Sequence, residues 1–314
     1  MSESYRLAAR SSGNSTRVHA GHAVFGDGGF ALIGGPCSIE SAAQIDEAAA
    51  GVAAAGGVML RGGAFKPRTS PYDFQGLGEE GLPLIAEAGA RHGLPVVTEA
   101  LAESHVALVA AYANMIQIGA RNMQNVPLLR AAARTGLPIL LKRGPSATLD
   151  ELLFAAEYVL ADGNPNVVLC ERGIRGFDRH TRNVSDLGGA LRLKELSHLP
   201  VILDPSHAAG RRSLIEPLTL AAAAAGLDGA IVEVHPHPAE ALCDAAQAID
   251  VSDFARIVTK VSSLRAALAP YEHGLAAGPT LRQAQGDIRQ AQGDIRQAQG
   301  DIRQAQGDAV PVSC

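Results

Sequence analysis

The chain has 314 residues, of which 47% are hydrophobic and 19% are charged, a composition typical of a globular protein with a full core. Its 27 basic and 32 acidic residues give a net charge of −5 without a long basic block, which disfavours nucleic acid and anionic membranes as partners. The four cysteines follow no CxxC or secreted spacing, and no apolar run is long enough to span a bilayer. We therefore expect a cytoplasmic protein in a reducing compartment.

Residues 1–30 form an extension that is too short for a second domain. The sequence HAVFGDGGF within it is compatible with a small hairpin at the floor of a barrel. From residue 31 onward a more regular pattern begins.

Eight short apolar runs follow, separated by Ala- and Leu-rich stretches of helical period. The helical stretches include 41–55, 103–113, 125–135, 148–161, 213–225 and 239–249. The apolar runs are continuous rather than alternating, which is typical of parallel strands buried on both faces. Eight such units over about 220–250 residues predict an α/β fold, a single-domain (β/α)8 TIM barrel over residues 31–275. A doubly wound sheet is the alternative.

The last part of the chain is different in kind. From Arg282 the heptapeptide RQAQGDI repeats three times, and a fourth copy stops at Asp308. One Ile and one Gly per repeat make a poor coiled coil, because the second apolar seam position is missing and Gly costs about 1 kcal/mol in a helix. We interpret 276–314 as a disordered low-complexity tail, with a weak helix as the alternative.

In a barrel of this kind the working residues lie at the carboxyl ends of the strands. One group found there is cationic: Arg61, Lys66, Arg68, Arg121, Lys142, Arg143 and Arg172. A single arginine at a strand end is more often part of a salt bridge at the rim. Seven cations together repel one another unless an anion lies among them, so the group predicts a substrate with phosphate and further anionic groups.

A second group of residues near the strand ends can ligate a metal. It comprises Cys37, His207, Glu233 and either Asp244 or His235. Thiolate, imidazole and carboxylate ligands suit Mn, Fe, Zn or Co, and they do not suit Mg or Ca. Each ligand also has a purely structural interpretation, as a buried apolar residue, a helix cap or an arginine partner. One metal accounts for all of them at once.

With these residues assembled, the chain resembles the class I 3-deoxy-D-arabino-heptulosonate 7-phosphate (DAHP) synthases, in the subclass similar to 3-deoxy-octulosonate 8-phosphate synthase. The resemblance covers about residues 30–250 and is carried, in the family's order, by GPCSIES, LRGGAFKPRTSPYDFQGLG, IGARNMQN, LLKRG, ERGIRGFDRHTRN, LDPSHAAGRR and IVEVHPHPAEALCDA. It implies a metal-dependent condensation of phosphoenolpyruvate with D-erythrose 4-phosphate and water, the first step of the shikimate pathway. Relatives are commonly tetrameric, so a homo-oligomer is implied as well.

The family pattern also assigns roles to individual residues. It implies that Mn²⁺, or alternatively Fe²⁺, Co²⁺ or Zn²⁺, is held by Cys37, His207, Glu233 and Asp244. It implies that phosphoenolpyruvate is bound by Arg61, Lys66, Gly119, Ala120, Arg121, Lys142 and Arg172. Erythrose 4-phosphate would contact Pro67, Arg68, Thr69, Ser70 and Asp204. The implied catalytic residues are Lys142, Glu99, Cys37 and His207, and the group that handles the proton of the reacting water is left open.

The chain departs from the family pattern at a few positions. Gly176 and His180 stand where relatives more often have Thr and Tyr, and two alanines follow Asp244 where Gly-Pro is common. No proposed ligand is lost. Relatives often carry an additional regulatory or chorismate mutase domain, for which the 30-residue extension has no room, so we expect no feedback inhibition by Phe or Tyr through a domain of this chain.

Three alternatives remain. The octulosonate synthases use arabinose 5-phosphate, but they usually read Ala-Asn-Arg-Ser after the lysine, whereas Pro67 to Ser70 read Pro-Arg-Thr-Ser here. A Schiff-base aldolase with Lys142 as nucleophile leaves the cysteine, histidine and carboxylates unexplained. A non-catalytic scaffold is disfavoured because all four metal ligands are present.

Overall fold

The computed structural model describes residues 5–11, 14–68 and 70–269. Its main feature is a closed barrel of eight parallel strands: β3 (Ala31–Gly35), β4 (Met59–Arg61), β5 (Val96–Glu99), β6 (Met115–Ile118), β7 (Ile139–Lys142), β8 (Val167–Glu171), β9 (Val201–Leu203) and β10 (Gly229–Glu233). The strands follow one another around the barrel in chain order, and β10 pairs with β3 to close it. The predicted (β/α)8 TIM barrel is confirmed.

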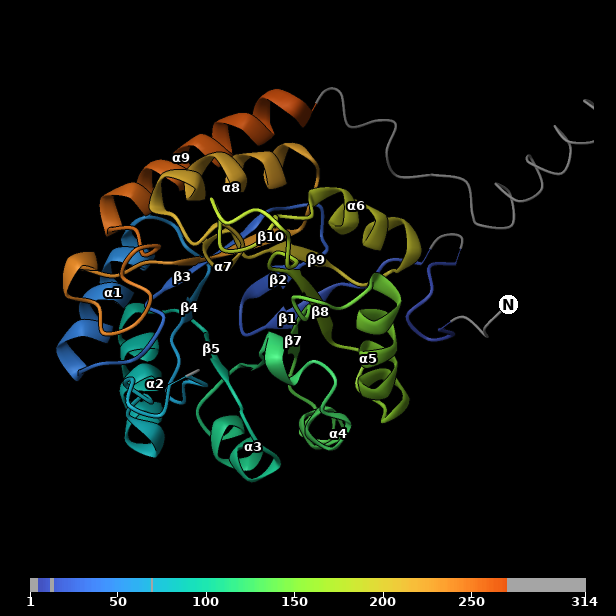
Figure 1. The fold of residues 1–314 in the computed structure, drawn as a ribbon, viewed down its shortest axis with the longest axis horizontal. Coiled ribbons are helices and arrows are strands. Elements are labelled where there is room, and N and C mark those ends of the chain that lie inside the picture. Colours follow the sequence, from blue (N-terminus) through green and yellow to red (C-terminus); the bar gives the residue numbers. More distant parts are fainter. Residues whose placement is uncertain (1–4, 12–13, 69, 270–314) are drawn as a thin grey trace, which may run out of the picture. The chain divides into compact units, whose positions relative to one another are not determined.

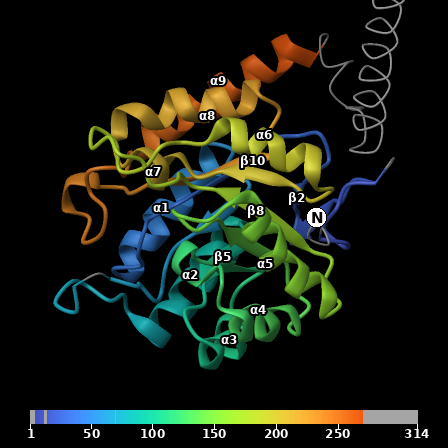
Figure 2. The ribbon, with the colours of Figure 1, turned by 45° about the vertical axis from the view of Figure 1, so that its right-hand side comes forward.

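The helices surround this ring of strands (Figure 1). They are α1 (Ala42–Ala54), α2 (Gly81–His92), α3 (Glu103–Ala110), α4 (Val126–Ala133), α5 (Leu149–Ala161), α6 (Leu187–Leu196), α7 (Pro205–Ala209), α8 (Ile215–Ala224) and α9 (Val251–Leu268). Local capping fixes several of their starts; Thr148 and Glu151, for example, form a reciprocal capping box at α5. Helices α8 and α9 lie side by side against the last part of the barrel (Figures 1 and 2).

The prediction of a helix over residues 239–249 is wrong. This segment holds a single 3-10 turn, Pro238–Glu240, followed by a loop, and the last helix begins only at Val251. Asp244 adopts a left-handed conformation with φ of 53°, which a right-handed helix does not allow. The loop instead carries Asp244 to the mouth of the barrel.

Side chains inside the barrel follow the alternation of the strands. The inward-facing hydrophobic residues are Ile33, Met59, Val97, Met115, Leu140, Val168, Ile202 and Ile231. Because side chains two residues apart on a strand share a face, the next inward positions toward the carboxyl ends can also be read from the sequence. On six strands the next inward position is polar: Arg61, Glu99, Gln117, Lys142, Asp204 and Glu233; on β8 it is Cys170, and Arg172 follows two residues later.

Strand β3 has Gly35 at this position, and the backbone of Gly35 lies close to the backbone of Arg61 in β4. Gly35 has a φ of 142°, and a Cβ there would lie 2.0 Å from the carbonyl oxygen of Arg61. Only glycine tolerates both conditions. Gly35 therefore allows β3 and β4 to meet tightly beside the polar end of the barrel.

A β-hairpin covers the opposite end of the barrel. Strands β1 (Val18–Ala20) and β2 (Ala23–Phe25) pair antiparallel, and their buried side chains pack with the inward-facing hydrophobic residues. Gly21 and Gly26 lie against Pro95 and Pro200, which immediately precede β5 and β9. The hairpin thus contributes to the core at the amino ends of the strands.

Two other expectations concern organisation. The division into an extension (1–30), a catalytic barrel (31–275) and a tail (276–314) stays a prediction, and the tail lies outside the described residues. In the described ranges no helix combines the length and the apolar character needed to cross a membrane. The cytoplasmic location also stays a prediction.

The hairpin makes a testable contribution to stability. Phe25 is fully buried, so Phe25→Ala should lower the free energy of unfolding by about 3–5 kcal/mol, as expected when a large core side chain is removed. Urea denaturation followed by circular dichroism measures this change. Phe177, which is fully exposed, provides the matched control, because Phe177→Ala should leave the free energy of unfolding unchanged. Equal effects of the two substitutions would show that the hairpin is not part of the core.

Candidate active site

A cavity of about 150 Å³ opens at the carboxyl ends of the strands. Of the residues predicted from the sequence, those that line it are Arg61, Lys66, Pro67, Arg68, Glu99, Gly119, Ala120, Arg121, Lys142, Arg172, His207 and Asp244. Cys37 and Glu233 lie directly beside it, in contact with His207 and Asp244. Ser70 and Asp204 do not line the cavity, and Thr69 lies outside the described residues.

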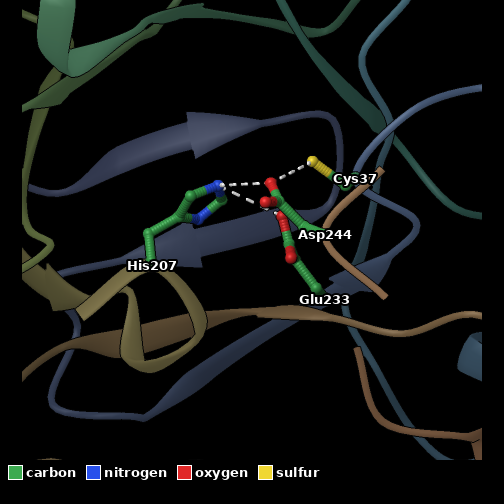
Figure 3. A group of neighbouring side chains, drawn as sticks. All are labelled: Cys37, His207, Glu233 and Asp244. Atoms are coloured by element: carbon green, nitrogen blue, oxygen red, sulfur yellow. Dashed lines mark hydrogen bonds and ion pairs between the residues drawn. The ribbon is translucent and has the colours of Figure 1, made fainter. Parts of the chain in front are cut away.

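The four proposed metal ligands form a tight cluster (Figure 3). One donor atom from each of Cys37, His207, Glu233 and Asp244 lies within 4.8 Å of the others. His207 Nε2 is 3.1 Å from Glu233 Oε1, and Cys37 Sγ is 3.2 Å from Asp244 Oδ2. His235, the alternative to Asp244, is instead 3.4 Å from the carboxylate of Glu40. The structure therefore brings Asp244 into the cluster and leaves His235 outside it.

The donor chemistry of this cluster fits a divalent metal. Burial lowers the pKa of His207, which favours the neutral imidazole that metal coordination requires. Burial, reinforced by the charge of Glu233, raises the pKa of the Cys37 thiol above its ordinary value. A thiol, an imidazole and two carboxylates converging on one point are consistent with a transition metal rather than with an all-oxygen site.

Glu233 is held from both sides. Arg61 Nη1 donates to Glu233 Oε1 at 3.0 Å, and Gln247 Nε2 donates to Oε2 at 2.6 Å. Burial alone would raise the pKa of Glu233, but His207, Arg61 and Lys66 outweigh it and lower the pKa to about 2. The carboxylate is therefore ionised at neutral pH and oriented before any ligand arrives.

Lys66 provides a second positive charge beside the cluster. Its Nζ lies 3.0 Å from Cys37 Sγ and donates to the Cys37 carbonyl oxygen at 3.0 Å. The lysine thus ties the loop after β4 to the loop after β3. It also favours the thiolate of Cys37, in opposition to burial.

Asp204 connects this cluster to Lys142. Its Oδ2 lies 2.5 Å from Lys142 Nζ and 2.8 Å from His207 Nδ1, and Oδ1 accepts the backbone N–H of His207 at 2.9 Å. Burial opposes its charge, but the contacts with His207 and Lys142 hold the pKa of Asp204 well below its usual range. A carboxylate on Nδ1 leaves Nε2 of His207 facing the cluster, as is typical behind a metal ligand.

Glu99 faces the cavity, and its carboxylate is oriented by Gln117, a residue that the sequence analysis did not identify. Gln117 Nε2 donates to Glu99 Oε2 at 2.9 Å, and both residues line the cavity. Gly119 lies against the same carboxylate, since a Cβ there would be 1.9 Å from Glu99 Oε1. Gln117 follows inward-facing Met115 by two residues, so the strand alternation was a usable signal for it. No comparable signal marks Arg182, a loop residue that also lines the cavity.

Two of the predicted cations, Arg143 and Arg68, differ in where they lie relative to the cavity. Arg143 points away from the cavity, where its Nη1 contacts Glu171 Oε2 at 2.9 Å and Asp186 Oδ2 at 2.8 Å. Arg68 remains at the cavity, with Nη1 2.8 Å from Cys243 Sγ and Nη2 3.3 Å from Asp73. Arg143 thus anchors the ends of β7 and β8, whereas Arg68 keeps donors at the mouth.

Two other arginines of the cavity have no partner within the described part of the chain. Arg121 and Arg172 make no hydrogen bond and no ion pair with the described residues, although Arg172 is buried. Burial lowers the pKa of Arg172, yet a guanidinium remains charged at neutral pH. A buried cation without a partner, such as Arg172, is costly, whereas Arg121 is exposed. Their arrangement indicates a site that is completed by an anionic ligand.

A closed parallel barrel with its cations and potential metal ligands gathered at one end is typical of a TIM-barrel enzyme whose site can bind an anionic ligand. Residues 13–268 match the model of the DAHP synthetase I family. The chain therefore belongs to this family, and the resemblance predicted from its motifs is confirmed. As a member it is an enzyme of the transferase class.

Individual relatives support the same assignment. A phospho-2-dehydro-3-deoxyheptonate aldolase of Thermotoga maritima is 47% identical over 265 residues, which are 84% of this chain and 78% of the relative. Its crystal structure matches with a TM-score of 0.82 over the same shares. A truncated form of the Thermotoga maritima synthase matches with a TM-score of 0.79 at 43% identity, covering 85% of this chain and 98% of that one. A 2-dehydro-3-deoxyphosphooctonate aldolase of Nitrobacter hamburgensis is 31% identical, over 79% of this chain and 93% of the relative.

The contacts of Arg143 predict a large effect on stability. Arg143→Met should lower the free energy of unfolding by about 3–5 kcal/mol, because it leaves the fully buried Glu171 without its cation. Chemical denaturation measures the loss, and a second substitution, Glu171→Gln, should recover part of it. Arg134→Met, at an exposed position, is the matched control and should have no effect. A loss no larger than that of the control would contradict the anchoring role.

Proposed function

We propose that this enzyme condenses phosphoenolpyruvate with D-erythrose 4-phosphate and water to form 3-deoxy-D-arabino-heptulosonate 7-phosphate and phosphate. The observation that carries the proposal is the pair of partnerless arginines, Arg121 and Arg172, in a cavity that borders the Cys37–His207–Glu233–Asp244 cluster. This arrangement can bind an anionic donor beside a group that activates a carbonyl. Membership of the DAHP synthetase I family supports the same reaction.

Phosphoenolpyruvate is the ligand that fits the inner part of the cavity. Its phosphate and carboxylate need several fixed cations, which Arg121, Lys142 and Arg172 can provide together with Lys66. The backbone of Gly119 and Ala120 borders the same space. We propose that these groups hold the enol so that its C3 carbon points toward the metal cluster.

The aldose phosphate is proposed to enter along the segment that follows Lys66. Arg68 has donors at the cavity mouth, Pro67 lines it, and Thr69 and Ser70 supply hydroxyl groups in the sequence. A guanidinium next to hydroxyl groups suits a phosphate monoester. The aldehyde end would then reach the metal cluster, while the phosphate stays at the mouth.

Bond formation joins C3 of phosphoenolpyruvate to C1 of the aldose, water adds to C2, and the C2–O bond to phosphate breaks. Cys37, His207, Glu233 and Asp244 would hold a divalent metal, which would supply a Lewis acid for the aldehyde carbonyl of the aldose. The surrounding arginines and lysines stabilise charge that develops on the enol and on the departing phosphate. Among them, Arg61 and Lys142 are held in place by buried ion pairs with Glu233 and Asp204.

We assign different tasks to the two carboxylates nearest Lys142. Glu99 has Oε2 engaged by Gln117, so its Oε1 is available to accept a proton from the water that adds to C2. Asp204 is shared by Lys142 and His207. We propose that Asp204 positions these two side chains, in place of the aldose contact suggested by the family pattern.

Turnover by chelator-treated protein tests the proposed function. With phosphoenolpyruvate and erythrose 4-phosphate, phosphate release should require added Mn²⁺. Arabinose 5-phosphate should give a rate at least about tenfold lower, because substrate discrimination by a few polar contacts is of this order or larger. Rapid turnover of arabinose 5-phosphate would assign the enzyme to the octulosonate reaction, and inactivity with both aldoses would contradict the proposal.

Metal binding should release one proton. The buried Cys37 thiol has a raised pKa and must become a thiolate to bind, whereas His207 is already neutral. Affinity for Mn²⁺ should therefore increase about tenfold per unit between about pH 6 and pH 8. Calorimetry in two buffers of different ionisation enthalpy counts the protons. Cys37→Ala should abolish their release and Cys170→Ala should preserve it; a wild-type protein that releases no proton would contradict the thiolate ligand.

A further inference from the structure

A second hollow lies outside the cavity, between the loop after β8 and the loop after β9. Its volume is about 590 Å³, and we call it the outer basin. The residues that define it by their chemistry are Arg179, Thr181, Arg182, Arg211, Arg212 and Ser213. Neither the sequence motifs nor the reaction proposed above gives these residues a task.

The outer basin is strongly cationic. Of the described residues, four arginines line it and no Asp or Glu does. Arg179 makes no hydrogen bond or ion pair with the described part of the chain. Arg211 and Arg212 donate only to backbone carbonyl oxygens, those of His180, Ala245 and Ala248. These contacts orient the guanidinium groups, and Asp250 lies near enough to Arg212 to interact with its charge.

The basin adjoins the active-site cavity through Arg182. This side chain lines both spaces, and its Nη1 contacts Asp244 Oδ1 at 3.3 Å and Gln247 Oε1 at 3.1 Å. It is the one described arginine of the basin that has a carboxylate partner. An anion that leaves or approaches the cavity on this side therefore passes the arginines of the basin.

We propose that the outer basin is a second phosphate-binding site, which takes phosphate monoesters or inorganic phosphate at the entrance of the active site. Arginine forks match the geometry of phosphate oxygens, and the hydroxyls of Thr181 and Ser213 can add donors. Because the lining side chains are largely exposed, binding there should be weak and should exchange rapidly. Clefts of one charge sign raise the local concentration of oppositely charged ligands and their rates of association.

Direct binding tests the site independently of catalysis. A cleft variant, Arg121→Ala/Arg172→Ala, weakens the inner anion site, and calorimetry with inorganic phosphate at low ionic strength should still detect one phosphate per chain. Adding Arg179→Ala/Arg211→Ala should abolish that binding. Adding Arg134→Ala/Arg192→Ala, which removes the same net charge at exposed positions elsewhere, should preserve it. Phosphate binding that is insensitive to Arg179 and Arg211 would overturn the proposal.

Kinetics with otherwise wild-type protein identify the source of the phosphate, and this arm rests on the proposed function. If the basin collects incoming substrates, Arg179→Ala/Arg211→Ala should lower kcat/KM by about threefold to tenfold at low salt, with kcat unchanged. The difference should fade above about 0.3 M salt. If the basin instead holds the departing phosphate, kcat/KM should stay unchanged and inhibition by added phosphate should weaken. Absence of all turnover would refute the proposed function and leave the binding result standing.

Discussion

Closure of the parallel barrel forces the carboxyl ends of eight strands to share one mouth, and the two-residue alternation decides which side chains enter it. Below the mouth the inward positions are hydrophobic and pack on the hairpin that contains Phe25. At the mouth the same face carries Arg61, Lys142, Asp204 and Glu233. The hydrophobic layer excludes water from beneath the charged layer. The charges must therefore be balanced by one another or by a ligand.

Pairing accounts for some of these charges and leaves others available. Arg61 is paired with Glu233, and Lys142 with Asp204. Such buried pairs fix side-chain positions more clearly than they add stability, because desolvation offsets much of their attraction. Arg172 has no hydrogen-bond or ion-pair partner among the residues that the structure describes. The site is thus organised before substrate binding, with its remaining positive charge directed at an anionic ligand, which is the electrostatic preorganisation that catalysis requires.

The barrel could be predicted from the sequence because continuous apolar runs alternate with helical stretches eight times, and the charged residues follow the carboxyl ends of the runs. The different roles of neighbouring residues in one motif were harder to predict. Lys142 faces the cavity, whereas Arg143 faces Glu171. Strand alternation distinguishes them only once the register is known. The choice of Asp244 over His235 depends on a left-handed loop conformation that local composition does not predict. The contact of Asp204 with Lys142 joins residues 62 positions apart in the sequence, so no local pattern revealed it.

The most direct test of this account is a crystal structure with Mn²⁺ and phosphoenolpyruvate bound, with anomalous scattering used to locate the metal. The account predicts one anomalous peak among Cys37 Sγ, His207 Nε2 and the carboxylates of Glu233 and Asp244. It also predicts the phosphate of phosphoenolpyruvate on Arg121 and Arg172. A metal bound elsewhere, or phosphoenolpyruvate bound without contact to these arginines, would contradict it.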